Sequence, residues 1–402
     1  MSRYRHLSVA IPMMAELENV PTLLHALQRQ NTHQFSLYCC VNNPEGWGSG
    51  VSEWEREVFD NNRQTLELLS SYQGKVPFDM HIIDCCTPGH GWRGKRKGVG
   101  WARKILFDTI GAHCDDDELI VSLDADTTFA DDYFSLLIDV FNRHPAHVAM
   151  AVPYYHPLTG GVHDRSMLRY EIYMRHYMLN LLAHNNPYAF TALGSAMVFP
   201  WWSYRRAGGI SPLQGGEDFY LMQKFAKTGN VLRSCNEFVK PQGRLSQRVP
   251  FGTGPAIAKG IDNMAVSYPL YPAEAFQAVA DTYSLFPQLY DVDEETPMSQ
   301  FLRSQLKTDD LWGPLRKNFK TNVLFVHACQ ERVDGLRILQ YLKTFPLRKA
   351  EDELIRYCNI HGISISPNFD FATTPISEIN AVRDALFDLE QKGRQQADIS
   401  IF

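Results

Sequence analysis

Five apolar runs alternate with helix-like segments over the first 153 residues, and this alternation constrains the fold more than any other feature. The runs are LSVAIP (7–12), FSLYCCV (35–41), FDMHIID (78–84), ELIVSL (118–123) and HVAMAVP (147–153). Nearly continuous hydrophobic strands separated by helices are typical of a parallel sheet covered on both faces. We therefore expect an α/β fold with a mostly parallel sheet flanked by helices.

The pattern becomes helical at 164–183 and again beyond about residue 255, where apolar residues recur at helical spacing. Between these regions lies an irregular aromatic stretch, PYAFTALGSAMVFPWWSY, which we expect to shape a pocket. A chain of 402 residues is longer than one core usually holds. We expect an α/β domain at 1–255 and an α-helical C-terminal region at 256–402.

Composition gives little drive toward nucleic acid or membranes. The net charge is −6, with 45% hydrophobic and 21% charged residues, as in ordinary soluble proteins. The N-terminal apolar run is too short for a signal peptide, and no stretch approaches the roughly 18 to 20 apolar residues of a membrane span. The eight cysteines form no CxxC or Cys/His cluster. We expect a cytoplasmic protein without a transmembrane segment, a nucleic-acid partner or a zinc site.

Asp124-Ala125-Asp126 follows the fourth apolar run directly. In open α/β sheets, ligands bind at the carboxyl ends of the strands. Carboxylate oxygens there suit Mg²⁺ or Mn²⁺ bound together with substrate phosphates. A solvated turn before the next helix is the alternative interpretation.

Two further motifs carry charged side chains toward the same edge. Glu217 and Asp218 follow two glycines and open an apparent helix, so they either cap it or supply a general base to a hydroxyl. Arg244 and Arg248 lie in a loop rich in Pro and Gly. They either clamp a diphosphate or face solvent.

The stretch PGHGWRGKRKGVGWARK (88–104) is rich in glycine and cations. It nearly matches a phosphate-binding P-loop, but Arg96 stands where the Ser or Thr should be. A dinucleotide fingerprint would follow the first strand of its unit, which this stretch does not. Its cations Arg93, Lys95, Arg96 and Lys97 either face an acceptor or form a solvated patch.

Taken in order, six segments resemble family-2-type glycosyltransferases with the GT-A fold. They are SVAIPMMAELENV, LYCCVNN, GVGWARK, LDAD, LGSAMVF and GGEDFYLMQKFAKTGN, within residues 7–255. RVPFGTG and GVGWARK also look like a bacterial subfamily of soluble enzymes. The resemblance implies a Rossmann-like nucleotide-diphospho-sugar transferase fold. It further implies transfer of a sugar from a nucleoside-diphosphate sugar to a hydroxyl of a glycan or small-molecule acceptor, with inversion.

The resemblance also assigns residues to the catalytic steps. It places Asp126 and Asp124 at a Mn²⁺ or Mg²⁺ ion, with Asp124 also near the ribose or sugar. It makes Asp218 the catalytic base and Glu217 its neighbour in the site.

For the sugar nucleotide, the resemblance implies contacts from Pro12, Glu16 and Arg103. It also favours Arg244 and Arg248 as residues that bind the diphosphate, over the alternative that they face solvent. Asn42 stands where family members usually carry Asp, which leaves the choice between UDP and GDP open. The absence of a QxxRW motif argues against a processive synthase, and peripheral membrane contact stays open.

Two other functions fit parts of this pattern. LIVSLDADTT also matches haloacid-dehalogenase-like phosphatases, with Asp124 as the nucleophile, although three strand-like runs precede it. A catalytically silent protein that binds a sugar nucleotide is the second alternative.

Overall fold

The computed structural model describes residues 3–49, 52–234, 236–243 and 268–399, which form two compact units. The first contains the described residues of Met1–Met167 and Thr191–Asp262. The second contains those of Leu168–Phe190 and Asn263–Ile401. None of the described helices is long and apolar enough to cross a membrane.

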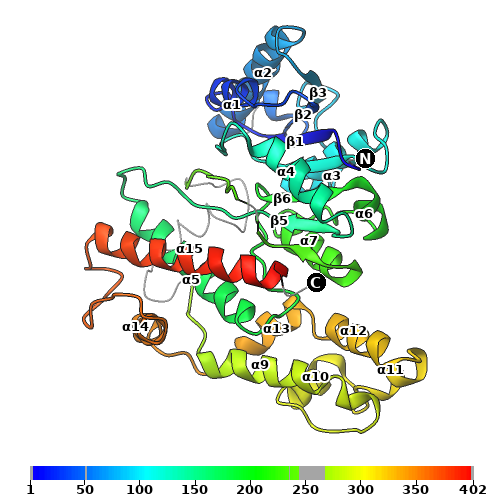
Figure 1. Ribbon diagram of the computed structural model, residues 1–402. Coiled ribbons are helices and arrows are strands. Elements are labelled where there is room, and N and C mark those ends of the chain that lie inside the picture. The colour runs from blue at the N-terminus through cyan, green and yellow to red at the C-terminus, as the bar shows by residue number, and fades with distance from the viewer. Residues whose placement is uncertain (1–2, 50–51, 235, 244–267, 400–402) are drawn as a thin grey trace. The chain divides into compact units, whose positions relative to one another are not determined.

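The first unit is built on a seven-stranded sheet with the order β3-β2-β1-β4-β6-β5-β7 (Figure 1). The strands are β1 (Leu7–Met13), β2 (Phe35–Asn42), β3 (Asp79–Cys85), β4 (Leu119–Ser122), β5 (Ala149–Ala151), β6 (Met197–Pro200) and β7 (Val231–Leu232). All pairings are parallel except those of β6, which runs antiparallel to β4 and β5. The expected mostly parallel α/β sheet is confirmed.

Burial along the strands follows their place in the sheet. β2 and β4 are buried at every position because they lie inside the sheet and have an apolar residue at most positions. β3 is an edge strand with mostly partial or full exposure. The antiparallel direction of β6 brings its first residue, Met197, beside Ser122, the last residue of β4. The segment before β6 therefore lies at the carboxyl end of β4.

Helices connect and cover these strands. They are α1 (Val20–Gln28), η1 (Trp47–Ser49), α2 (Glu53–Tyr72), α3 (Val99–Gly111), α4 (Tyr133–Arg143), α6 (Trp201–Arg206) and α7 (Glu217–Thr228). The long helix α2 begins with a capping box, in which Ser52 and Glu55 satisfy each other's backbone amides. It packs against β2 and β3, whereas α3 packs against β1 and β2.

The second unit is helical, as expected for the C-terminal region. Helix α5 (Asp164–Leu182) contributes its residues from Leu168 onward. The other elements are α9 (Ala273–Leu285), η2 (Gln288–Tyr290), α10 (Ser299–Leu306), α11 (Gly313–Asn318), α12 (Asn322–Arg332), α13 (Gly335–Leu342), α14 (Ala350–Ile360) and α15 (Ile376–Ile399). Figure 1 shows α15 lying across α5. Gly393 permits this approach, since a Cβ there would lie 2.7 Å from Leu182 Cδ2.

A cluster of buried charges also joins α5 to α15. Arg175 donates to Glu171 at 2.5 Å and to Glu390 at 2.7 Å, and all three side chains are fully buried. Glu390 also accepts from Arg394 Nε at 2.7 Å, and Glu171 accepts from Arg383 at 3.2 Å. Charges removed from water are stable only when paired in this way, so this cluster specifies how α5 and α15 pack.

We predict that Glu390→Ala lowers the free energy of unfolding by about 3–5 kcal/mol, because it removes the carboxylate shared by two buried arginines. Denaturant unfolding measures this difference. The matched control is Glu295→Ala, which breaks an exposed pair with Arg303 and should cost much less, because water screens that pair. Equal losses in the two variants would show that the buried cluster contributes no more to the free energy of unfolding than an exposed ion pair does.

Candidate active site

The two aspartates that follow β4 lie on a tight turn. Leu123 donates the last sheet-like hydrogen bond to Ala10, and Thr127 then donates to the carbonyl of Asp124 at 3.1 Å. Ala125 and Thr127 are buried, whereas Asp124 and Asp126 are partly exposed. The turn therefore places both aspartates at the carboxyl end of β4, where each is partly exposed.

Arg103, one turn into α3, ties this turn to the start of α7. Its side chain is 3% exposed, and Nη2 donates to Asp124 Oδ1 at 2.6 Å. Nη1 donates to Glu217 Oε1, whose side chain is equally buried. Burial acts to lower the pKa of Arg103, but Asp124, Glu217 and Asp218 outweigh it and raise that pKa. The cation is thus held between segments more than 90 residues apart in sequence.

A serine and a glycine also contact the guanidinium of Arg103. Arg103 Nε donates to Ser122 Oγ at 3.3 Å, and Ser122 Oγ donates to the carbonyl of Gly194 at 2.7 Å. A Cβ on Gly194 would lie 2.1 Å from Arg103 Nη2. The backbone before β6 therefore lies against the guanidinium, where no side chain would fit.

Asp218 is the second residue of α7, directly after Glu217. Its Oδ1 accepts from the amide of Phe219 at 2.8 Å, and the side chain keeps partial exposure. Burial, followed by the charge of Glu217, raises the pKa of Asp218 to about 7, against the opposing effect of Arg103. A carboxylate of this kind is a stronger base than an ordinary aspartate.

The described site has more negative than positive charge. Asp124, Glu217 and Asp218 surround the single guanidinium of Arg103. The second oxygen of Asp124, Oδ2, accepts no hydrogen bond from the described residues, and this side chain is 39% exposed. Two partly exposed carboxylates fit a divalent ion that completes its shell with water and phosphate oxygens. No group of three or more metal-binding side chains occurs within the described ranges.

Two asparagines hold the carboxyl ends of β1 and β2 together. Asn42 Nδ2 donates to the carbonyl of Met13 at 3.0 Å, so its amide joins the ends of β1 and β2. Asn62 of α2 is fully buried and donates to the carbonyl of Asn42 at 3.0 Å. It also accepts from the amide of Ala15 at 2.8 Å, where the backbone has a φ of 54°. Asn42 therefore has a structural bond beside any contact to a nucleobase.

The other residues implied for the nucleotide are placed as follows. Pro12 lies in β1, beside Cys40 of β2, and is partly exposed. Glu16 is buried in the loop after β1 and accepts from Asn19 Nδ2 at 2.7 Å. Arg244 and Arg248 lie outside the described residues.

Two glycines of the stretch that resembled a P-loop pack against backbone. A Cβ on Gly98 would lie 2.8 Å from Gln214 Cα, and one on Gly100 would lie 2.2 Å from the carbonyl oxygen of Leu213. Both contacts are to the segment that leads into Glu217. These glycines thus set the approach of α3 to α7.

Three residues of this site were missing from the sequence prediction. They are Ser122, Gly194 and Asn62. Asn62 left a signal, because asparagine is a poor choice inside a helix unless its side chain bonds elsewhere. Ser122 stood as a polar residue within an otherwise apolar strand. Gly194 lies in the segment LGSAMVF, but nothing in that segment indicated a contact with Arg103.

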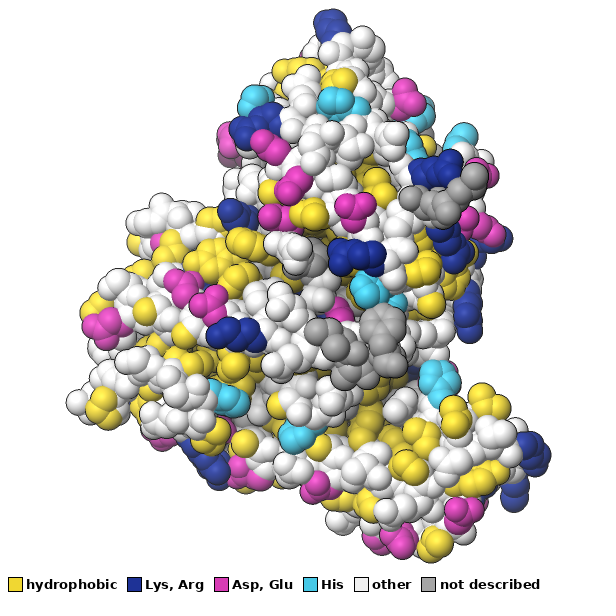
Figure 2. Space-filling view, viewed as in Figure 1, with side chains coloured by type: hydrophobic (Ala, Val, Ile, Leu, Met, Phe, Trp, Pro, Cys, Tyr) yellow, Lys and Arg dark blue, Asp and Glu magenta, His cyan; other side chains and the backbone are white. Residues whose placement is uncertain are grey.

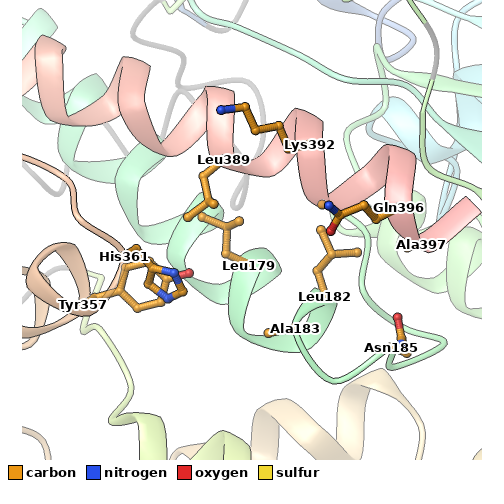
Figure 3. A pocket seen from close by; sticks show the side chains of 11 residues that line it. Leu179, Leu182, Ala183, Asn185, Tyr357, His361, Leu389, Lys392, Gln396 and Ala397 are labelled. Atoms are coloured by element: carbon orange, nitrogen blue, oxygen red, sulfur yellow. The ribbon is translucent and has the colours of Figure 1, made fainter.

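The second unit holds a hollow of about 480 Å³ between α5, α14 and α15 (Figure 3). Figure 3 shows Leu179, Leu182 and Leu389 in its wall. The titratable side chains that line it are Tyr357, His361 and Lys392. No carboxylate lines it. It therefore lacks the paired acids that the first unit brings together.

Comparisons with known proteins find no matching family model and no matching curated protein. Among solved structures, the chain is similar to S. aureus TarS 1–349 in complex with UDP-GlcNAc, with 10% identity, coverage of 90% of this chain and 93% of that one, and a TM-score of 0.42. It is also similar to the mannosyltransferase PcManGT from Pyrobaculum calidifontis in complex with GDP-Man and Mn²⁺, at 15% identity, 82% and 87% coverage, and a TM-score of 0.37. Because these TM-scores are below 0.5, the functional conclusion depends on the side chains of the site.

We predict that Gly194→Ala lowers the free energy of unfolding by about 1–3 kcal/mol, because its methyl group would displace the buried guanidinium of Arg103. Denaturant unfolding measures the loss. Gly161→Ala is the control, since a Cβ there meets only Thr159 Oγ1, at 3.1 Å. If Gly194→Ala is no worse than Gly161→Ala, Arg103 has room that the structure does not show.

Asp218 should also make stability depend on pH. Its pKa is higher in the folded chain than the usual value of about 3.9, so the folded state binds more protons between about pH 4 and 7. The free energy of unfolding should therefore fall across this range as pH rises. Asp218→Asn should remove this part of the fall, so its stability relative to the parent chain increases from pH 4 to 7. Asp60→Asn, at an exposed position of α2, is the control variant measured in parallel.

Proposed function

We propose that this protein is a metal-dependent glycosyltransferase. It moves a sugar from a nucleoside-diphosphate sugar to an acceptor hydroxyl, with inversion and with Asp218 as the general base. The resemblance of its motifs to family-2-type enzymes supports this assignment.

One observation carries the proposal. Arg103 bonds both Asp124, which follows β4, and Glu217, which begins α7. This pairing brings the two acidic motifs together at one edge of the sheet. Considered alone, the first motif could be a solvated turn and the second could only cap a helix. A solvated turn and a capped helix would have no need of a shared, buried arginine.

The described residues divide the chemistry between them. Asp218 takes the proton of the acceptor hydroxyl as that oxygen attacks the anomeric carbon from the face opposite the leaving group. Arg103 holds Glu217 and Asp124 in place through its hydrogen bonds to both carboxylates. Because one displacement exchanges the two oxygens at the anomeric carbon, its configuration inverts.

Asp126 and the outer oxygen of Asp124 would hold Mn²⁺ or Mg²⁺. The ion, when bound, stabilises negative charge on the departing nucleoside diphosphate. Glu217 is less suited to metal binding, since its side chain is 2% exposed and bonded to Arg103.

The direct test is release of nucleoside diphosphate from a panel of UDP- and GDP-sugars in the presence of Mn²⁺ or Mg²⁺. We predict that Asp218→Asn lowers kcat by about 10²- to 10⁴-fold, because an amide accepts no proton. Asp126→Asn should instead weaken metal binding, which is measured without turnover by titrating Mn²⁺ and following its paramagnetic signal. Asp60→Asn, on α2, is the control for both measurements.

Three outcomes would contradict the proposal. The first is the absence of diphosphate release with any donor, together with unchanged donor binding in Asp126→Ala. The second is full activity of Asp218→Asn, which would remove the assigned base. The third is release of inorganic phosphate from small phosphate esters that is lost in Asp124→Asn, which would favour a phosphatase.

A further inference from the structure

Four cations lie within five residues of the loop between β3 and α3. Arg93, Lys95, Arg96 and Lys97 are all exposed. The chain as a whole carries a net charge of −6, and both acidic and basic side chains occur on the face shown in Figure 2. Residues 93–97 are thus a local concentration of positive charge in a chain that is acidic overall.

The backbone holds this loop on both sides of the cations. Before them, Trp92 donates to the carbonyl of Asn43 at 3.0 Å and accepts from the amide of Glu45 at 2.8 Å. After them, Gly98 and Gly100 pack on Leu213 and Gln214. Because both ends are fixed, the five residues between them present their side chains from a defined base.

A tight turn directs the cations outward. Arg96 donates its amide to the carbonyl of Arg93 at 3.3 Å, and Gly94 has a φ of 65°, a conformation that favours glycine. Arg96 lies over the ring of Trp101 at 5.5 Å. The side chains of Arg93, Lys95 and Lys97 make no hydrogen bond or ion pair with any described residue. Their charge is thus not used within the described fold.

The turn also lies close to the candidate active site. Arg103 follows Val99, the first residue of α3, by four residues, which is about 6 Å along a helix. On the other side, the segment packed against Gly98 leads within three residues to Glu217. The turn is therefore directly connected to α3, which carries Arg103, and its C-terminal end packs on the segment that leads to Glu217.

We propose that residues 93–97 bind negatively charged groups of the acceptor, so that the acceptor is an anionic, phosphate- or carboxylate-bearing glycan. This inference rests on the proposed function. The divalent ion, when bound, would neutralise part of the charge of the donor's two phosphates. The four cations at residues 93–97 are exposed, which suits an acceptor that approaches from solvent.

The test compares the full-length chain with the triple variant Arg93→Gln/Lys95→Gln/Lys97→Gln. Inorganic polyphosphate is the anionic probe and neutral dextran the uncharged one, and binding is measured calorimetrically without donor at two salt concentrations. We expect the variant to bind polyphosphate about 10- to 100-fold more weakly and with less salt dependence. The control variant Lys307→Gln/Lys317→Gln/Lys320→Gln makes the same change in net charge in the second unit and should bind like the parent chain.

Each other outcome overturns the inference. Equal polyphosphate binding by both triple variants would mean that only net charge matters. A selective loss of UDP or GDP binding would assign the cations to the donor. A selective loss of binding to phosphatidylglycerol vesicles, with polyphosphate binding kept, would assign them to a membrane. No arm of this test needs turnover. Loss of polyphosphate binding in the variant, together with no transfer from any donor, would therefore contradict the proposed function and leave residues 93–97 with an anion-binding role only.

Discussion

The first unit depends on one buried guanidinium. Arg103 would be costly to bury alone, and it is stable because Asp124 and Glu217 meet it from two other segments. The same contacts settle where α3, the turn after β4 and the start of α7 lie. The arginine in turn fixes the positions of both carboxylates. The groups that position the site are thus among those that would do its chemistry.

Periodicity predicted the parallel part of the sheet well. The apolar runs that became β1, β2 and β4 are buried along nearly their whole length. Strands of this kind can be predicted from the local sequence, without knowing which strands they pair with. β6 escaped prediction because MVFP is short and lies in an aromatic stretch. Its antiparallel direction depends on pairing with β4, which no local pattern encodes. Likewise, the link from α5 to α15 depends on charges such as Arg175 and Glu390, 215 residues apart.

Motifs at strand ends predicted which carboxylates reach the edge of the sheet, because strand ends and helix starts are visible in sequence. The same reasoning could not give their partners. Arg103 was expected near the nucleotide, and its bonds to Asp124 and Glu217 appear only in three dimensions. Asn42 shows the same limit, since its amide also has a structural use at Met13. The assignment of these residues to a nucleotide stays a prediction.

The contacts of Gly98 and Gly100 with Leu213 and Gln214 have a consequence for engineering. Because no side chain separates the backbone at Gly98 and Gly100 from the backbone at 213–214, the two segments are in direct contact. A shift of one segment must therefore move the other. The segment before Glu217 is therefore unsuited to act as an independent lid. Replacing this segment alone with a foreign one would displace α3, which carries Arg103. A graft at this site should therefore carry residues 93–103 and 213–218 together as a single module.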